Sequence, residues 1–342
     1  MTERSVEQKR ESWTVRFAAA VALAAIGVGW RGFSLPQCAP AGASQGGPPK
    51  AQRLPDDLAG VSDAKYASLG GLAAGSQDAQ ERQRQAVQQL GLPLEVCTQK
   101  TGIVFRLVPA GSFTMGSPLD EAQRGDDETQ HQVTLTKAFY CGKFEVTQGQ
   151  WQQVMGTNPS SFKNASPRYP VENVSWDDCQ AFVKKLCQTE EVPEGTYRLL
   201  TEAEWEYACR AGTTTAFCYG NDLDSSRANF DGNYPYGGSR RGQARGTTVA
   251  VGSFGPNAWG LYDMHGNVQE CCQDWYGGYA GGAVTDPLGP ASGDQRVRRG
   301  GSWFYSDWFC VCRSAARVRG TPGGRSGIGV GLRLARTTPS YP

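Results

Sequence analysis

The chain has 342 residues, enough for one large domain or two smaller ones. It carries 34 Lys and Arg against 33 Asp and Glu, and this balance provides no basic surface for nucleic acid or an acidic membrane. The 44 Gly and 19 Pro are accompanied by 9 Trp, 13 Tyr and 13 Phe, which excludes collagen and low-complexity disorder and indicates a loop-rich globular protein.

The N-terminal segment, residues 1–38, begins with charged residues and continues with an apolar run from Phe17 to Trp30. The run is shorter than the ~20 residues that cross a membrane, but it matches the apolar region of a secretory signal. We expect a signal or membrane anchor here, with the rest of the protein exported or membrane-anchored outside the cytoplasm. A buried Ala-rich helix is the alternative.

Residues 39–96 are expected to be a linker that contains one solvated helix. Their first part, to about Gly60, is rich in Ala, Gly, Pro and Ser and has no periodicity, which is typical of a linker. Residues 76–90 combine helix formers with few apolar residues, which indicates a helix surrounded by solvent. The chain then becomes dense in aromatics and turn pairs, and we expect one domain at 97–337 and a tail at 338–342.

Three helices are predicted in this domain from their N-terminal capping residues. They run from Thr147 to about Met155, from Ser175 to about Cys187, and from Thr201 through Cys209. Short alternating runs at 132–136 and 296–298 predict strands. The stretch at 211–259 has many glycines and little periodicity, so regular packing alone does not account for it.

Several phrases of the domain occur together in one known family. They are residues 108–116 (VPAGSFTMG), 144–147 (FEVT), 170–176 (PVENVSW), 198–207 (RLLTEAEWEY), 257–267 (NAWGLYDMHGN), 299–303 (RGGSW) and 312–315 (CRSA). In this order they resemble the formylglycine-generating enzyme, or sulfatase-modifying factor, family, over residues 102–337. The resemblance implies an α+β fold related to C-type lectins, with little regular secondary structure.

The copper chemistry of the family needs two thiolates, and this chain supplies one of them. Formylglycine generators hold Cu(I) with two cysteines separated by four residues, and the matching positions here are Tyr305 and Cys310. Monovalent copper prefers two thiolates, so we do not expect copper, and Cys310 would be catalytic only in an active enzyme. Cys312 could replace the missing thiolate, but the family gives it another partner. The sulfoxide synthases of the family need a three-histidine iron site, which the chain's two histidines, His131 and His265, exclude.

Calcium is the cofactor that the resemblance favours. The family binds it through side chains that match Asp263 and Glu270 and carbonyls that match Gly266 and Val268, and oxygen ligands at this spacing suit the ion. A capped turn with solvated acids is the alternative. A second family site would begin at Asn229 and the Phe230 carbonyl, although its usual acid falls on Gln243.

Eleven cysteines are many for a reducing compartment, and the odd number leaves at least one without an intramolecular partner. By resemblance to the family, Cys209 pairs with Cys312. The remaining cysteines have no assigned partner, and small buried apolar residues are the alternative for them.

The C-terminal segment is predicted to be a recognition surface. Its contact residues are Phe304, Tyr305, Ser306, Asp307, Trp308, Phe309 and Val311. Apart from Trp308, each has a codon that is reached from an asparagine codon by changing adenines, which is similar to the variable proteins of diversity-generating retroelements. Ordinary drift in a surface loop is the alternative explanation. We therefore expect a monomeric protein that binds an unidentified protein or small ligand, with a copper-dependent formylglycine-generating oxidase as the alternative.

Overall fold

A computed structural model describes residues 54–62, 64–163, 166–304, 311–325, 327 and 329–339 of the protein. The expected signal or anchor at residues 1–38 therefore lies outside the described residues. Among the described helices, none is long and apolar enough to cross a membrane.

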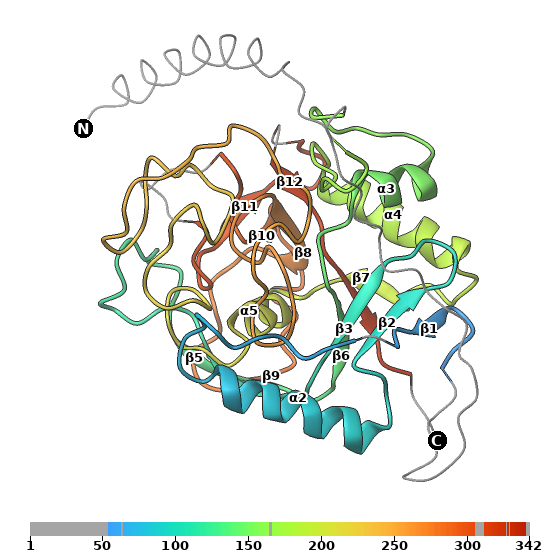
Figure 1. The fold of residues 1–342 in the computed structure, drawn as a ribbon, viewed down its shortest axis with the longest axis horizontal. Helices are drawn as coiled ribbons and strands as arrows, with labels where there is room; N and C mark the ends of the chain where they lie inside the picture. The colour runs from blue at the N-terminus through green and yellow to red at the C-terminus, as the bar shows by residue number, and fades with distance from the viewer. Residues whose placement is uncertain are drawn as a thin grey trace. The chain divides into compact units, whose positions relative to one another are not determined.

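The largest sheet has six strands and carries the main hydrophobic core (Figure 1). In spatial order the strands are β1 (Leu58–Gly60), β2 (Glu95–Thr98), β3 (Val104–Val108), β6 (Phe139–Gly142), β13 (Leu334–Thr337) and β7 (Tyr197–Leu199). All neighbouring pairs are antiparallel. Because β13 lies between β6 and β7, the end of the domain is part of its core.

Two smaller sheets complete the strand structure. The four-stranded sheet has the order β11 (Val318–Gly320), β10 (Arg296–Arg299), β8 (Gln269–Trp275) and β12 (Val330–Gly331). The three-stranded sheet has the order β4 (Gly111–Met115), β5 (His131–Leu135) and β9 (Val284–Thr285). The strands predicted at 132–136 and 296–298 correspond to β5 and β10.

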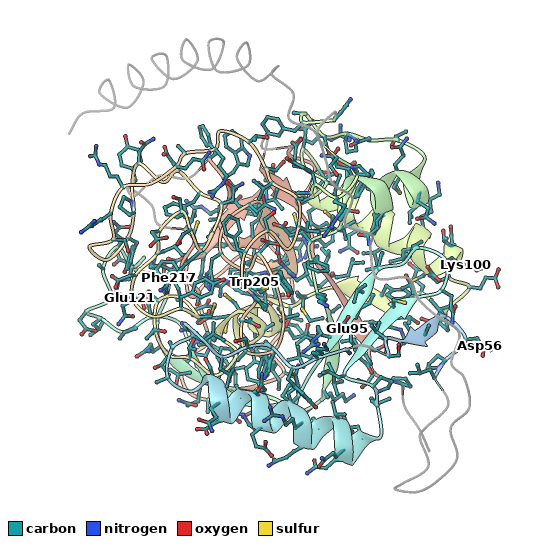
Figure 2. The ribbon with its side chains drawn as sticks, viewed as in Figure 1. Asp56, Glu95, Lys100, Glu121, Trp205 and Phe217 are labelled. Atoms are coloured by element: carbon teal, nitrogen blue, oxygen red, sulfur yellow. The ribbon has the colours of Figure 1, made fainter. Side chains whose placement is uncertain are left out.

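The three predicted helices are confirmed, each with a capping box at its start. They are α3 (Gln148–Met155), α4 (Trp176–Thr189) and α5 (Glu202–Arg210). In each, the hydroxyl of the cap residue accepts a hydrogen bond from the third helical N–H, and the side-chain oxygen of that third residue accepts one from the backbone N–H of the cap. Helix α5 is almost entirely buried, and its Trp205 lies near the centre of the domain (Figure 2).

The expected linker at 39–96 differs from the structure in its second half. Residues 58–60 form β1 of the large sheet, and α2 (Ser76–Leu90) packs along one edge of the domain (Figure 1). Gln83 is fully buried and donates to the carbonyls of Leu107 and Trp259, while the Trp259 indole donates to the Ala79 carbonyl. The helix predicted at 76–90 is therefore confirmed with most of its residues exposed or half-buried, but one face is buried and is held by polar side chains that bond to backbone.

A small core of its own holds the irregular stretch at 211–259. Its buried apolar residues are Ala216, Phe217, Leu223, Ala228, Phe230 and Tyr236, together with Cys312 from the C-terminal part. The Phe217 and Tyr236 rings meet edge to face at 5.1 Å. Mixed sheets, few helices and long ordered loops confirm the expected α+β class.

Candidate functional site

The loop expected to bind calcium leads directly into β8 and turns sharply. Asp263, Gly266 and Asn267 all have positive φ, of 58°, 99° and 61°. A Cβ on Gly266 would lie 2.4 Å from the Asn229 carbonyl oxygen, so this position requires glycine. The Gly266 N–H donates to the Gly300 carbonyl, which fixes the loop against the start of the C-terminal segment.

Three buried carboxylates gather at this loop. Glu270 receives three contacts of 2.7–3.0 Å from Arg333 and a hydrogen bond of 2.6 Å from the Trp205 indole. One oxygen of Asp263 accepts from the Gly252 N–H at 2.6 Å, and the other is buried without a hydrogen-bond partner among the described residues. Glu145 accepts hydrogen bonds from the Asn267 side chain and from the backbone N–H of Val268.

The charges of these groups do not balance within the site. Burial raises the pKa of Glu145 well above its ordinary value, and the charges of Asp263 and Glu270 raise it further. Burial also raises the pKa of Asp263 to about 6, although the Gly252 N–H and Arg333 act in the opposite direction. Arg333 thus opposes three acids, and a bound cation would offset the excess negative charge.

The second expected site adjoins the first. Asn229 forms a bridge with Gly266, and its side-chain nitrogen donates to Thr247 and Asn267. Its side-chain oxygen is buried and has no hydrogen-bond partner in the described part of the chain. Phe230 is buried beside it. The structure therefore brings all six expected metal residues into one region.

The residues of this loop offer oxygen atoms that suit a calcium ion, but they offer too few side-chain ligands to complete its coordination. Unpartnered buried oxygens on Asp263 and Asn229 and the excess negative charge suit a hard cation. Within the described ranges, no group of three or more His, Cys, Asp or Glu side chains is placed to hold a metal ion. Backbone carbonyls would have to complete the ligand set, as the expected Gly266 and Val268 carbonyls would. Glu145 belongs to the 144–147 phrase, and no spacing in the sequence links it to the loop at 263–270.

The expected Cys209–Cys312 disulfide is not formed. Cys209 is a free, buried thiol, and its sulfur lies 3.7 Å from the Ser314 hydroxyl and 3.8 Å from His265 Nε2. Cys312 instead points its sulfur toward the backbone of Gly301. Residues 311–315 form turns and not a strand. Side chains in a turn do not alternate regularly, so the sequence did not reveal that Ser314, and not Cys312, faces Cys209.

Most of the described thiols offer little to a soft metal. Cys271 is the exception, because a hydrogen bond from Cys179 lowers its pKa and the charge of Arg298 lowers it further. Burial raises the pKa of both Cys141 and Cys209 to about 12, and it raises that of Cys272 well above its ordinary value. Cys97 is disulfide-bonded. Cys310, the thiol expected in the copper position, lies outside the described residues.

Two of the expected recognition residues, Phe304 and Val311, are described. Phe304 is 41% exposed and meets the Trp303 ring at 5.4 Å, and Trp303 in turn meets Phe162 from a distant loop at 5.5 Å. The backbone N–H of Trp303 donates to the Asn267 carbonyl, which joins this segment to the loop expected to bind calcium. The other expected residues, Tyr305, Ser306, Asp307, Trp308 and Phe309, lie outside the described part of the chain.

Comparisons with known proteins agree with the resemblance. The sulfatase-modifying factor enzyme 1-like domain matches residues 94–338. The formylglycine-generating enzyme of Bos taurus is 30% identical over 285 residues, covering 67% of this chain and 73% of that protein. That of Streptomyces coelicolor is 37% identical over 177 residues, covering 49% of this chain and 53% of that protein.

Two solved structures are similar over most of their length. Treponema denticola variable protein 1 has a TM-score of 0.58 and 29% identity, covering 69% of this chain and 95% of its own. PvdO from Pseudomonas aeruginosa has a TM-score of 0.58 and 32% identity, covering 70% of this chain and 96% of its own. On the profile match and these similarities, the chain belongs to the sulfatase-modifying factor enzyme 1-like family.

Proposed function

We propose that this protein binds a ligand through its C-terminal segment and does not oxidise sulfatase cysteines. The observation that carries the proposal is Tyr305, a phenol at the position of the family's first copper thiolate. Cu(I) is a soft ion that two thiolates bind well, whereas one thiolate and a phenol form a poor site. The scaffold is kept, and the residues needed for its oxidation chemistry are incomplete.

Three of the described cysteines, Cys141, Cys209 and Cys312, support this proposal because they are not suited to replace the missing thiolate. The sulfur of Cys312 is buried and packs against Gly301. Cys209 and Cys141 have pKa values that burial raises to about 12, so their thiols stay protonated near neutral pH. A thiolate, not a thiol, is the metal ligand.

The C-terminal segment has the features of a displayed surface on a fixed base. Its base is hydrogen-bonded to the calcium loop at Gly300 and Trp303, and Phe304 is exposed just beyond it. Aromatic side chains provide large contact area at low entropic cost, which suits recognition of a protein or small ligand. Similarity to Treponema denticola variable protein 1 agrees with a segment that diversifies, as in a retroelement-linked variable protein.

Calcium is the cofactor that this proposal includes. Asp263 would supply a carboxylate oxygen, and Gly266 and Val268 would supply carbonyls. Glu270 would coordinate the ion by giving up part of its contact with Arg333, which binds both of its oxygens. When bound, the ion would offset the excess charge of the buried acids and rigidify the loop that holds Trp303. We further propose that the protein acts as a monomer outside the cytoplasm, exported or anchored by its N-terminal segment.

The test is oxidation of a cysteine-containing sulfatase peptide. The purified chain, supplied with Cu(I), O₂ and a thiol reductant, is expected to leave the peptide unchanged in mass spectrometry, while the bovine formylglycine-generating enzyme converts it. A Tyr305→Cys variant restores the two-thiol spacing with Cys310 and serves as the matched control for copper binding. Formylglycine formed by the wild-type chain would overturn the proposal and establish the oxidase alternative.

A further inference from the structure

A cavity of about 510 Å³ lies between the three-stranded sheet and the N-terminal end of α5. None of its lining residues belongs to the loop at 263–270, and Arg317 is its one lining residue from the C-terminal part of the described chain. Its walls come from β4, β5, β8 and β9, the first residues of α5, and the loops at 277–280 and 287–290. This volume falls within the range of ~300–1,000 Å³ that small-molecule sites occupy.

Most of the wall is apolar. Met115, Ala203 and Val284 line the cavity, and Leu288 lies with them at 70% exposure. Leu288 is one of few large apolar side chains that are well exposed in the described residues. An apolar wall with an exposed apolar residue suits a ligand with an apolar body.

The basic group of the wall is already paired. Arg317 donates to both oxygens of Glu202 at 2.7 and 2.8 Å, and its remaining nitrogen donates to the Asp127 carbonyl. Arg299, which lies behind Glu202, contacts the same carboxylate at 3.1 Å. These guanidiniums are therefore not available to a ligand anion.

Asp274 is the acid of the wall that keeps an open oxygen. Its side chain is 3% exposed, and one oxygen accepts from the Glu202 N–H at 2.8 Å. The other oxygen accepts no hydrogen bond from the described residues. Burial raises the pKa of Asp274 to about 7, with the charge of Glu202 acting in the same direction and Arg299 opposing it. The carboxylate thus lacks a cationic partner of its own.

His131 adds a second polar group to the same wall. Its Nδ1 lies 3.0 Å from the Thr129 carbonyl, which assigns the ring proton to Nδ1 and leaves Nε2 to accept a hydrogen bond. The ring rests on Tyr279 with centroids 4.6 Å apart. Two acceptors and no unpaired cation line the cavity within the described residues, so a donor is the group that the site lacks.

We propose that this cavity binds a small molecule that has an apolar body and a primary ammonium group, with the ammonium donating to Asp274. The apolar body lies against Met115 and Val284, and a second ammonium hydrogen can reach His131. This site goes beyond the proposed recognition function, because none of its lining residues lies between 304 and 311.

The experiment measures binding of three matched probes to the full chain by isothermal titration calorimetry at pH 8. Phenethylamine, 2-phenylethanol and phenylacetate share one apolar body and differ in charge. Hydrogen bonds between charged partners are roughly twice as strong as neutral ones, so we expect the amine to bind at least about tenfold tighter than the alcohol. Phenylacetate is expected to bind weakest. Binding of phenylacetate as tight as that of the amine would refute the proposed charge preference.

Two variants locate the binding. Asp274→Asn keeps an acceptor for the Glu202 N–H but turns the open oxygen into a donor, so the amine should lose its advantage over the alcohol. Val284→Trp fills the cavity and should abolish binding of all three probes, with folding checked by circular dichroism. An amine that binds Asp274→Asn as tightly as wild type, or no amine binding at ~10 mM to the folded wild-type chain, would overturn the proposal.

Discussion

Replacing Asp274 by Asn should change stability in a direction that depends on pH. The folded state raises the pKa of this buried acid from 3.8 to about 7, so it binds the proton more tightly folded than unfolded. Protonated Asp274 therefore contributes its full stabilisation below its pKa in the unfolded chain. This contribution is lost as the pH rises from about 4 to about 7. Asn removes the titration and keeps the acceptor for the Glu202 N–H.

The expected size follows from the two pKa values. A difference of about three units, at about 1.4 kcal/mol each, gives an upper limit of about 4 kcal/mol between pH 4 and pH 8. Between pH 4 and pH 8, the unfolding free energy of the wild type should fall by up to this amount relative to that of Asp274→Asn. The two proteins should be within about 1 kcal/mol of each other at pH 4, and the variant should be the more stable one at pH 8. Urea unfolding at both pH values measures the difference.

Asp178 supplies a control of opposite sign. Burial acts to raise its pKa, but hydrogen bonds from Arg325 and Ser175 outweigh burial and lower it. Asp178→Asn should therefore lose stability relative to wild type as the pH rises. If Asp274→Asn changes stability equally at pH 4 and pH 8, the folded protein does not raise the pKa of Asp274, and the argument for its open oxygen fails.

Two further predictions concern the thiol and calcium regions. Ser314→Cys should form a disulfide with Cys209 under oxidising conditions, because the Cys209 sulfur already lies 3.7 Å from the Ser314 hydroxyl oxygen. Closing a loop of about 100 residues should stabilise the folded state by up to ~4.7 kcal/mol. Peptide mapping that finds both thiols free would contradict this. Calcium at 100 times its dissociation constant should add about 2.7 kcal/mol to wild-type stability. Asp263→Asn should lose this gain while remaining as stable as wild type in chelator, and an equal response of both proteins to calcium would contradict the assigned site.

The sequence predicts those parts of the fold that local chemistry determines. Within each capping box the two partners are three residues apart, so Thr147, Ser175 and Thr201 identify the starts of their helices without tertiary information. Helix α2 shows the limit of this approach. Its buried positions include Ser76, Gln80 and Gln83, and a hydropathy pattern does not reveal side chains that are buried to bond backbone carbonyls.

The candidate site was predictable in part for a similar reason. The acids at 263 and 270 belong to one short loop and were assigned through its resemblance to the family's calcium loop, whereas Glu145 reaches that loop from 122 residues away in the sequence. The partner of Cys209 depends on a turn that no pattern specifies. Asp274 and His131, which define the cavity, come from different sheets, and nothing in the sequence indicates that one wall contains both.

Arg313 distinguishes the fixed base of the C-terminal segment from its displayed part. It is 2% exposed and donates to Glu121 and Glu128 at 2.6–2.7 Å, and to the Gln123 carbonyl at 2.7 Å. Arg313→Met keeps most of the volume but leaves two acids without their cation in the interior. Breaking a buried pair in this way costs about 3–5 kcal/mol.

A matched variant on the surface separates this effect from a general loss of charge. Arg325 pairs with Asp178 but is 54% exposed, so Arg325→Met should cost less than ~1 kcal/mol. Phe304→Ser should also cost about 1 kcal/mol or less, since the ring is well exposed. Urea unfolding of the three variants gives the order directly. A cost for Arg313→Met no greater than that for Arg325→Met would contradict a rigid base, and with it the argument that residues near Phe304 can vary without loss of the fold.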